Sequence, residues 1–160
     1  MVEENGALGR TIAIAESCTG GLVAAAITEI AGSSAVLDRG FVTYSNAAKI
    51  ESLGVSEHII DAFGAVSIAT AWAMAQGALR KSTADIAVAV TGIAGPDGGS
   101  ILKPVGTVVF AQAERDGTAE PTGDQKLFEG GNRSAIRLAA AKWALELLLP
   151  AQAEAADLAP

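Results

Sequence analysis

Residues 11–21 read TIAIAESCTGG, and this stretch decides the fold class. Residues 11–16 form a short apolar run with β-branched side chains, which indicates a strand buried on both faces of a sheet. The segment SCTGG interrupts the run, and a helix is predicted to follow over residues 22–30 and to end near Gly32. A buried strand that turns directly into a helix is typical of α/β folds.

A second apolar run of the same kind lies at residues 85–90, DIAVAV, and a long glycine-rich loop follows it over residues 91–104. Ligands of open α/β sheets bind beyond the carboxyl ends of the strands. If the two buried strands are neighbours, the SCTGG segment and the glycine-rich loop therefore line one crevice. This convergence is the strongest functional signal in the residues themselves.

The remaining pattern alternates between predicted strands and helices. Further strands are expected over residues 36–44, 105–113 and 125–128, and helices over residues 46–52 (capped by Asn46), 56–63, 67–81 and 133–149 (capped by Asn132). This alternation predicts an α/β fold with a mainly parallel sheet, to which a late hairpin adds an antiparallel strand. We expect one domain over residues 1–150 and a frayed tail over residues 151–160.

The composition argues against a membrane protein, a secreted protein and a nucleic-acid-binding protein. The chain has 160 residues, of which 50% are apolar and 18% are charged, and its net charge is -7 at pH 7. It has no stretch of 18 apolar residues, so no membrane span is expected, and its start, MVEENGALGR, lacks the apolar core of a signal peptide. The lack of a basic stripe argues against direct nucleic-acid binding. We therefore expect a cytoplasmic domain that acts on a small molecule.

Ser17 precedes the predicted helix 22–30, and this position has two interpretations. A serine there is an ordinary helix cap. Alternatively, it is a nucleophile beside the free N–H groups of a helix N-terminus, which could stabilise an oxyanion. The chain contains neither a G-x-S-x-G nucleophile elbow nor a GxxxxGK phosphate loop. From the residues alone, capping is the default interpretation.

The next residue, Cys18, is the only cysteine, and His58 is the only histidine. Buried cysteines are usually inert, and one cysteine with one histidine cannot build a typical zinc site, so no metal is expected. A serine nucleophile would therefore need a lysine as its base. Lys49 lies in the first turn of a predicted helix, where the dipole disfavours a cation, and Tyr44 could relay a proton. A solvated lysine and a strand-end tyrosine are the alternative.

Glycines and arginines are candidates for binding an anion. The glycines of the loop 91–104 are Gly92, Gly95, Gly98 and Gly99. Their backbone N–H groups could cradle phosphate or carbonyl oxygens, although a plain surface loop is the alternative. Arg133 opens the last helix, where its charge opposes the helix dipole, so a bound anion or an ion pair with Glu129 would relieve the conflict. Arg137, one turn later, forms a candidate phosphate site together with Arg133.

Seven segments together resemble the CinA C-terminal domain family. They are AESCTGG (15–21), AGSS (31–34), RGFVTYSNAAK (39–49), GAVS (64–67), TGIAGPDGG (91–99), KPVGTV (103–108) and GNR (131–133). These uncommon strings occur in the family's order over about residues 11–149. The resemblance implies a three-layer α/β/α sandwich and the hydrolysis of nicotinamide mononucleotide (NMN) to nicotinate mononucleotide and ammonia. This pyridine nucleotide salvage reaction would need neither a metal nor a cofactor.

The resemblance also implies roles for individual residues. Ser17 corresponds to the nucleophile, and Lys49 and Tyr44 correspond to its base and its proton-relay partner. The N–H groups of Thr19 and Gly20 would bind the amide oxygen. The residues expected to face ribose and phosphate are Asn46, Gly92, Gly95, Gly98, Gly99 and Arg133.

Three features depart from the family pattern. Larger members carry an N-terminal domain associated with nucleotide pyrophosphatase activity, and that chemistry is not expected of this sequence. The family's domain usually begins with a full helix, whereas only MVEENGALGR precedes the first strand here. This difference affects the outer helical layer and the packing of an expected homo-oligomer. Asn132 stands where an aspartate is also familiar, and either residue caps a helix.

Two other functions stay open. The first is a non-catalytic nucleotide-binding or regulatory module, which would bind NMN in the same crevice without turnover. The second follows from the family's link to competence and DNA damage and is a protein-interaction role in DNA repair. The net charge of -7 disfavours direct contact with DNA but has no bearing on a protein partner.

Overall fold

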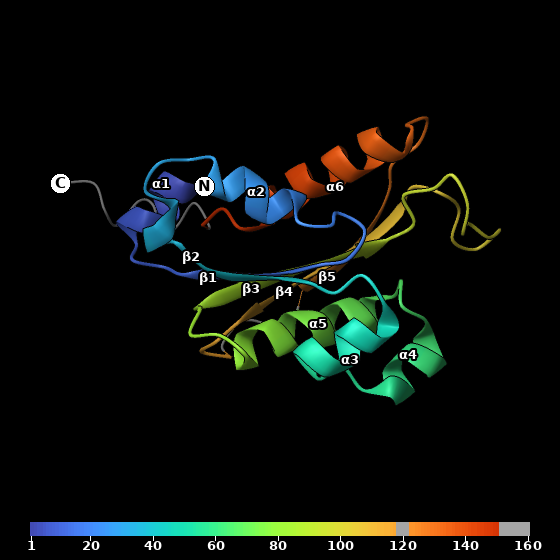
Figure 1. Ribbon diagram of the computed structural model, residues 1–160, viewed down its shortest axis with the longest axis horizontal. Coiled ribbons are helices and arrows are strands. Elements are labelled where there is room, and N and C mark those ends of the chain that lie inside the picture. Colours follow the sequence, from blue (N-terminus) through green and yellow to red (C-terminus); the bar gives the residue numbers. More distant parts are fainter. Residues whose placement is uncertain (118–121, 151–160) are drawn as a thin grey trace.

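The computed structural model describes residues 1–117 and 122–150. Within these residues, a five-stranded sheet with the order β2-β1-β3-β4-β5 is covered by helices on both faces (Figure 1). The strands are β1 (Ile12–Glu16), β2 (Leu37–Val42), β3 (Ile86–Gly92), β4 (Thr107–Glu114) and β5 (Thr122–Leu127). The helices are α1 (Val2–Ala7), α2 (Leu22–Thr28), α3 (Asn46–Leu53), α4 (Glu57–Phe63), α5 (Ile68–Arg80) and α6 (Arg133–Leu147), with a short 3-10 helix η1 (Ser33–Ala35). The predicted frayed tail, 151–160, lies outside the described residues.

Strand β1 lies between β2 and β3 and is parallel to both, with Ile14 aligned with Gly40 on one side and with Val88 on the other. Strand β4 is antiparallel to both of its neighbours, β3 and β5. The predicted α/β class and the mainly parallel, mixed sheet are confirmed. The condition for a shared crevice is met, because β1 and β3 are neighbours and the SCTGG segment and the glycine-rich loop leave the sheet side by side.

The two faces of the sheet carry side chains of different size. Isoleucines and valines of the central strands pack with Phe110 on the face covered by α2 and α6. The inward residues of the other face, under α5, are mostly alanines: Ala13, Ala15, Ala87, Ala89, Ala111 and Ala113. This shallow surface lets α5 approach the sheet closely. Helix α3 packs closely on α5 in turn, because a Cβ at Gly77 would collide with the carbonyl oxygen of Leu53.

Side-chain caps set the start of three helices. Ser67 caps α5 and Asn132 caps α6, each by accepting a backbone N–H, as predicted. Helix α3 differs from the prediction, because Ser45 accepts the N–H of Ala48 at 3.0 Å and Asn46 is the first helical residue. The expected cap was therefore misplaced by one residue, between two side chains that cap equally well.

Helix α1 was not predicted from the sequence, and it lies in the segment where the sequence departs from the full first helix usual in the family. Asn5 is fully buried, and its Nδ2 donates to the carbonyl of Leu148 at 2.9 Å. Arg10 donates to the same carbonyl at 3.1 Å. Asn5 and Arg10 together therefore satisfy a carbonyl just beyond the end of α6, where the carbonyls of a helix lack partners within the helix.

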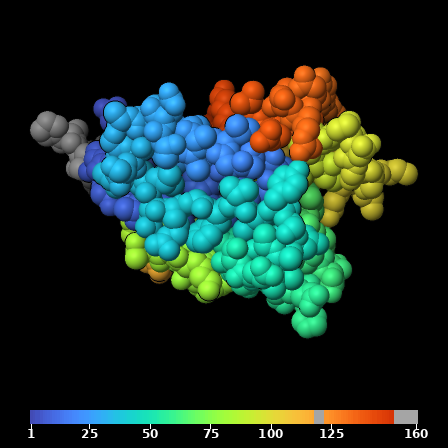
Figure 2. All heavy atoms as spheres, in the orientation of Figure 1, coloured from blue at the N-terminus to red at the C-terminus, as the bar shows by residue number. Residues whose placement is uncertain are grey.

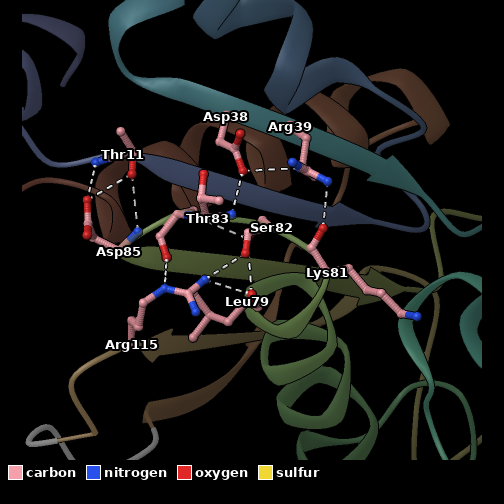
Figure 3. Close-up of polar contacts among 10 residues, drawn as sticks. Thr11, Asp38, Arg39, Leu79, Lys81, Ser82, Thr83, Asp85 and Arg115 are labelled. Atoms are coloured by element: carbon pink, nitrogen blue, oxygen red, sulfur yellow. Dashed lines mark hydrogen bonds and ion pairs between the residues drawn. The ribbon is translucent and has the colours of Figure 1, made fainter.

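The amino-terminal edge of the sheet is closed by side chains that bind backbone groups (Figure 3). Asp85 accepts the Thr11 N–H at 2.7 Å and the Thr11 hydroxyl at 2.8 Å, which ties the start of β1 to the start of β3. Arg115 donates to three carbonyls near the end of α5, those of Leu79, Ser82 and Ala84. These polar side chains hold the fold together at the edge opposite the predicted crevice.

The Asp85 contact predicts a pH-dependent contribution to stability. The backbone N–H of Thr11 holds the pKa of the Asp85 carboxyl below its ordinary value of 3.8. Because the folded pKa is the lower one, the stabilisation is fully present at neutral pH and is lost as the pH falls through the folded pKa. We expect Asp85→Asn to cost about 1 kcal/mol at pH 7, a modest value because the carboxylate is exposed.

Thermal unfolding of wild type and Asp85→Asn at pH 7 and near pH 3 measures this effect. At pH 7 the variant should melt about 2–4 °C lower, and the gap should narrow in acid. Asp61→Asn, which removes an exposed carboxylate from α4, is the matched control. A gap that widens in acid would contradict the prediction.

Candidate active site

A cavity of about 290 Å³ lies at the carboxyl edge of the sheet, where β1 and β3 end. Its walls come from the loops after these strands, the start of α3, the α4–α5 connection and the start of α6. The residues that line it are Ser17, Cys18, Tyr44, Asn46, Lys49, Ala65, Val66, Thr91, Gly92, Ile93, Ala94, Gly95, Asp97, Gly98 and Arg133. Both predicted loops therefore contribute to one cavity.

The side chains of Ser17 and Lys49 are in contact in a buried part of this cavity. The Nζ of Lys49 lies 3.1 Å from Ser17 Oγ and 3.0 Å from the carbonyl oxygen of Thr43, and it donates to both. Lys49 is 1% exposed, so the alternative of a solvated surface lysine is wrong. Burial lowers the pKa of Lys49 below its ordinary value of 10.5. A buried lysine with a lowered pKa loses its proton more readily and is then able to accept the proton of a serine hydroxyl.

Glu16, the residue before Ser17, occupies the N-terminus of α2. Its carboxylate is buried and accepts the N–H groups of Gly21 at 2.9 Å, Val23 at 3.1 Å and Ala24 at 2.9 Å. Interpreting Ser17 as lying beside free N–H groups of the helix therefore needs correction. The carboxylate already satisfies these donors, and an anion at this helix end is favourable.

The two predicted oxyanion donors have different surroundings. The N–H of Gly20 donates to the carbonyl of Ser17 at 3.0 Å, so this donor is already engaged. Among the residues that the structure describes, the N–H groups of Cys18 and Thr19 have no acceptor on another residue. Cys18 lines the cavity, whereas Thr19 and Gly20 do not. The free donors in this loop are thus Cys18 and Thr19.

Tyr44 and Arg133 meet at the mouth of the cavity. Arg133 donates from Nη2 to the Tyr44 hydroxyl at 2.8 Å and from Nη1 to the carbonyl of Gly95 at 2.6 Å. These contacts connect the end of β2, the glycine-rich loop and the start of α6. They also give the Arg133 guanidinium partners other than the predicted Glu129. Tyr44 is 61% exposed, and its hydroxyl contacts Arg133.

Polar contacts fix the wall formed by the α4–α5 connection. Thr91 donates from its hydroxyl to the carbonyl of Ala65 at 2.9 Å. Lys103 donates from Nζ to the carbonyls of Val66 at 2.6 Å and Phe63 at 3.3 Å. The predicted glycine-rich loop therefore supports the cavity with side chains as well as with its backbone. Part of this loop also projects from the body of the molecule beside α6 (Figure 2).

The structure brings most of the predicted site residues together. Those lining the cavity are Ser17, Tyr44, Asn46, Lys49, Gly92, Gly95, Gly98 and Arg133. Thr19, Gly20 and Gly99 do not line it, and Gly99 packs instead against the backbone of Val105. Arg137 also departs from the predicted phosphate pair, because it donates to the carbonyls of Cys18 and Thr19.

Glu16 was missed, although the sequence contains a signal for it. A glutamate at the end of a run as apolar as TIAIAE has to be satisfied where it is buried. In the parts of the chain that the structure covers, no group of three or more His, Cys, Asp or Glu residues is arranged to hold a metal ion. The same described residues contain no helix that is long and apolar enough to span a membrane.

The amino-acid sequence is similar to those of several known proteins. The family model described as the CinA C-terminal domain matches residues 1–151. The chain is 57% identical to the nicotinamide-nucleotide amidohydrolase PncC of Enterobacter agglomerans, over 89% of this chain and 85% of that protein. It is 53% identical to the protein of the same name from Escherichia coli K12, over 89% and 84%.

A solved structure shows the same fold. The competence/damage inducible protein CihA from Agrobacterium tumefaciens superposes with a TM-score of 0.88 and 53% identity, covering 92% of this chain and 88% of that chain. This structural neighbour is consistent with the predicted α/β/α sandwich.

The surroundings of Cys18 predict an unreactive thiol. Burial raises the pKa of Cys18 from 9.0 to about 11. Because the thiolate is the reactive form, alkylation by iodoacetamide at pH 8 should be about 100-fold slower in the folded protein than in the unfolded protein. Intact mass spectrometry with and without denaturant measures both rates. Equal rates would contradict the burial of an uncharged thiol at this position.

Proposed function

The chain belongs to the CinA C-terminal domain family, and we propose that it is a nicotinamide-nucleotide amidohydrolase that converts NMN to nicotinate mononucleotide and ammonia. The observation that carries the proposal is the buried contact of 3.1 Å between Lys49 Nζ and Ser17 Oγ. The contact lies in a cavity at the carboxyl edge of the sheet, and two relatives named for this reaction are 53% and 57% identical to the chain.

In the proposed first step, Ser17 Oγ attacks the carboxamide carbon while the neutral amine of Lys49 accepts the serine proton. The Lys49 ammonium then returns this proton to the amide nitrogen. The C–N bond breaks, ammonia leaves, and a Ser17 ester remains. In the second step, a water molecule gives a proton to Lys49 and attacks the ester. The ester C–O bond breaks, the proton returns to Ser17, and nicotinate mononucleotide is released.

The oxyanion of each tetrahedral intermediate needs backbone donors close to the nucleophile. We assign this role to the N–H groups of Cys18 and Thr19, since Gly20 N–H donates to Ser17 and Glu16 holds the donors of α2. This assignment retains Thr19 from the sequence-based prediction and replaces Gly20 with Cys18.

The nucleotide part of the substrate is proposed to bind at the mouth of the cavity. Arg133 supplies a cation there, and Asn46 and the loop containing Gly92, Gly95 and Gly98 lie around it. An anionic phosphate on Arg133 would compete with the Tyr44 hydroxyl for the same guanidinium. Substrate binding would then free Tyr44 for its predicted role as a proton relay.

Ser17→Ala tests the nucleophile. We expect ammonia release from NMN to fall by about 10³-fold or more, because the covalent route is lost. Ser52→Ala, which alters an exposed serine of α3, is the matched control and should retain activity. Full activity in Ser17→Ala would remove Ser17 from the mechanism, and loss in Cys18→Ala alone would favour the thiol. Saturable NMN binding by wild type without ammonia release would support the non-catalytic module.

The lowered pKa of Lys49 predicts how activity depends on pH. The neutral amine is the active form, so kcat/KM should rise with pH through the pKa of Lys49, at a value below the ordinary 10.5. Initial rates of ammonia release between pH 5 and 10 would measure this rise of kcat/KM with pH. Lys49→Arg keeps a cation but cannot act as a base, so this variant should lose both the activity and the rise of kcat/KM with pH. An unchanged pH profile in Lys49→Arg would contradict the assignment.

A further inference from the structure

Arg137, in the second turn of α6, binds the backbone of the nucleophile loop. Its Nε donates to the carbonyl of Cys18 at 3.0 Å and its Nη2 donates to the carbonyl of Thr19 at 2.8 Å. The side chain is half-buried and does not line the cavity, unlike that of Arg133. A residue 119 positions away in sequence therefore fixes two consecutive peptide groups next to Ser17.

Almost every other N–H in this loop already has an acceptor. The N–H of Ser17 donates to Val90 at 2.9 Å and that of Leu22 donates to Thr19 at 3.3 Å. Gly20 and the donors held by Glu16 are engaged as described above. Within the described residues, two N–H groups of this loop, those of Cys18 and Thr19, have no acceptor on another residue, and Arg137 donates to the carbonyl of each of these residues.

The Cys18 carbonyl and the Thr19 N–H belong to the same planar peptide group. In a trans peptide, the C=O and the following N–H point in opposite directions. With the Cys18 carbonyl directed at Arg137, the Thr19 N–H of the same peptide group points away from α6. The guanidinium charge also polarises this peptide group, which makes its N–H a better donor.

We propose that Arg137 is a positioning residue that aims and holds the Thr19 N–H, the oxyanion donor beside Ser17 whose peptide group it binds. This inference rests on the proposed amide hydrolysis and adds a residue to it. Arg137 acts through the backbone of Cys18 and Thr19 and does not touch the substrate. Preorganised donors of this kind need no rearrangement during the reaction, so their stabilisation is realised in the transition state.

Gly20 makes room for this contact. A Cβ at Gly20 would lie 3.2 Å from Nη2 of Arg137, and the φ of Gly20 is +59°, a region that side chains other than glycine rarely adopt. Gly20 therefore serves the proposed site by shaping the loop, while its N–H stays on the Ser17 carbonyl. The role implied for Gly20 by the family resemblance is thereby replaced by a structural one.

Steady-state kinetics of Arg137→Met with NMN test the proposal. We expect kcat to fall about 10- to 100-fold while KM changes less than about 3-fold, because transition-state donors are displaced and ground-state binding is not. Arg137→Lys, which keeps the charge but not the forked donor, should recover part of kcat. Lys142→Met removes an exposed cation from the same helix and should match wild type. An unchanged kcat, or a rise in KM alone as for a phosphate ligand, would overturn the proposal.

Hydrogen–deuterium exchange gives a readout that does not depend on turnover. The segment 16–22 should exchange faster in Arg137→Met than in wild type, and it should be unchanged in Lys142→Met. If wild type fails to hydrolyse NMN, the proposed function fails, and the exchange of this segment alone decides the positioning role. Unchanged exchange would overturn that role. If Arg137→Met does not fold, Arg137→Lys is measured in both experiments, with partial effects expected.

Discussion

The buried carboxylate of Glu16 is the interaction on which the rest of the site depends. It ends β1 and accepts three N–H groups at the start of α2, so it fixes the strand and the helix on either side of the loop 17–20. Leaving those three donors without partners would cost about 1–3 kcal/mol each. Its charge also takes the anion site of the helix, so that an oxyanion or a phosphate has to be bound elsewhere. The carboxylate thus leaves the proposed oxyanion donors in the loop 17–20.

Two side chains of opposite charge bind the backbone N–H groups and carbonyls around this loop. Glu16 holds N–H groups, and Arg137 holds carbonyls. On the other face of the sheet, Lys49 reaches Ser17 from α3, because the alanine surface and Gly77 bring α5 and α3 close to the strands. The packing that excludes water around Lys49 is also the cause of its lowered pKa. Core packing and reactivity are therefore linked in this protein.

Much of the fold could be predicted, because buried parallel strands leave a plain apolar pattern and their carboxyl ends have to meet. The pairing of Ser17 with Lys49 followed from the shortage of histidine and from the family resemblance. The oxyanion donors were only partly predictable, because a sequence shows which residues precede a helix but not which N–H groups are already bonded. Arg137 was expected to bind phosphate, since nothing in a sequence shows that an arginine reaches backbone carbonyls over a hundred residues away. Ser45 and Asn46 differ too little in capping strength for their order to be decided.

The alanine face has an evolutionary consequence. Enlarging one of these side chains by a methyl group or two would push the α5 layer outward and carry α3 with it. The separation of Lys49 from Ser17 would then grow without any change in a residue that touches substrate. Variants that gain stability from larger side chains on this face would therefore hydrolyse the substrate more slowly. Activity should therefore constrain the size of these six side chains.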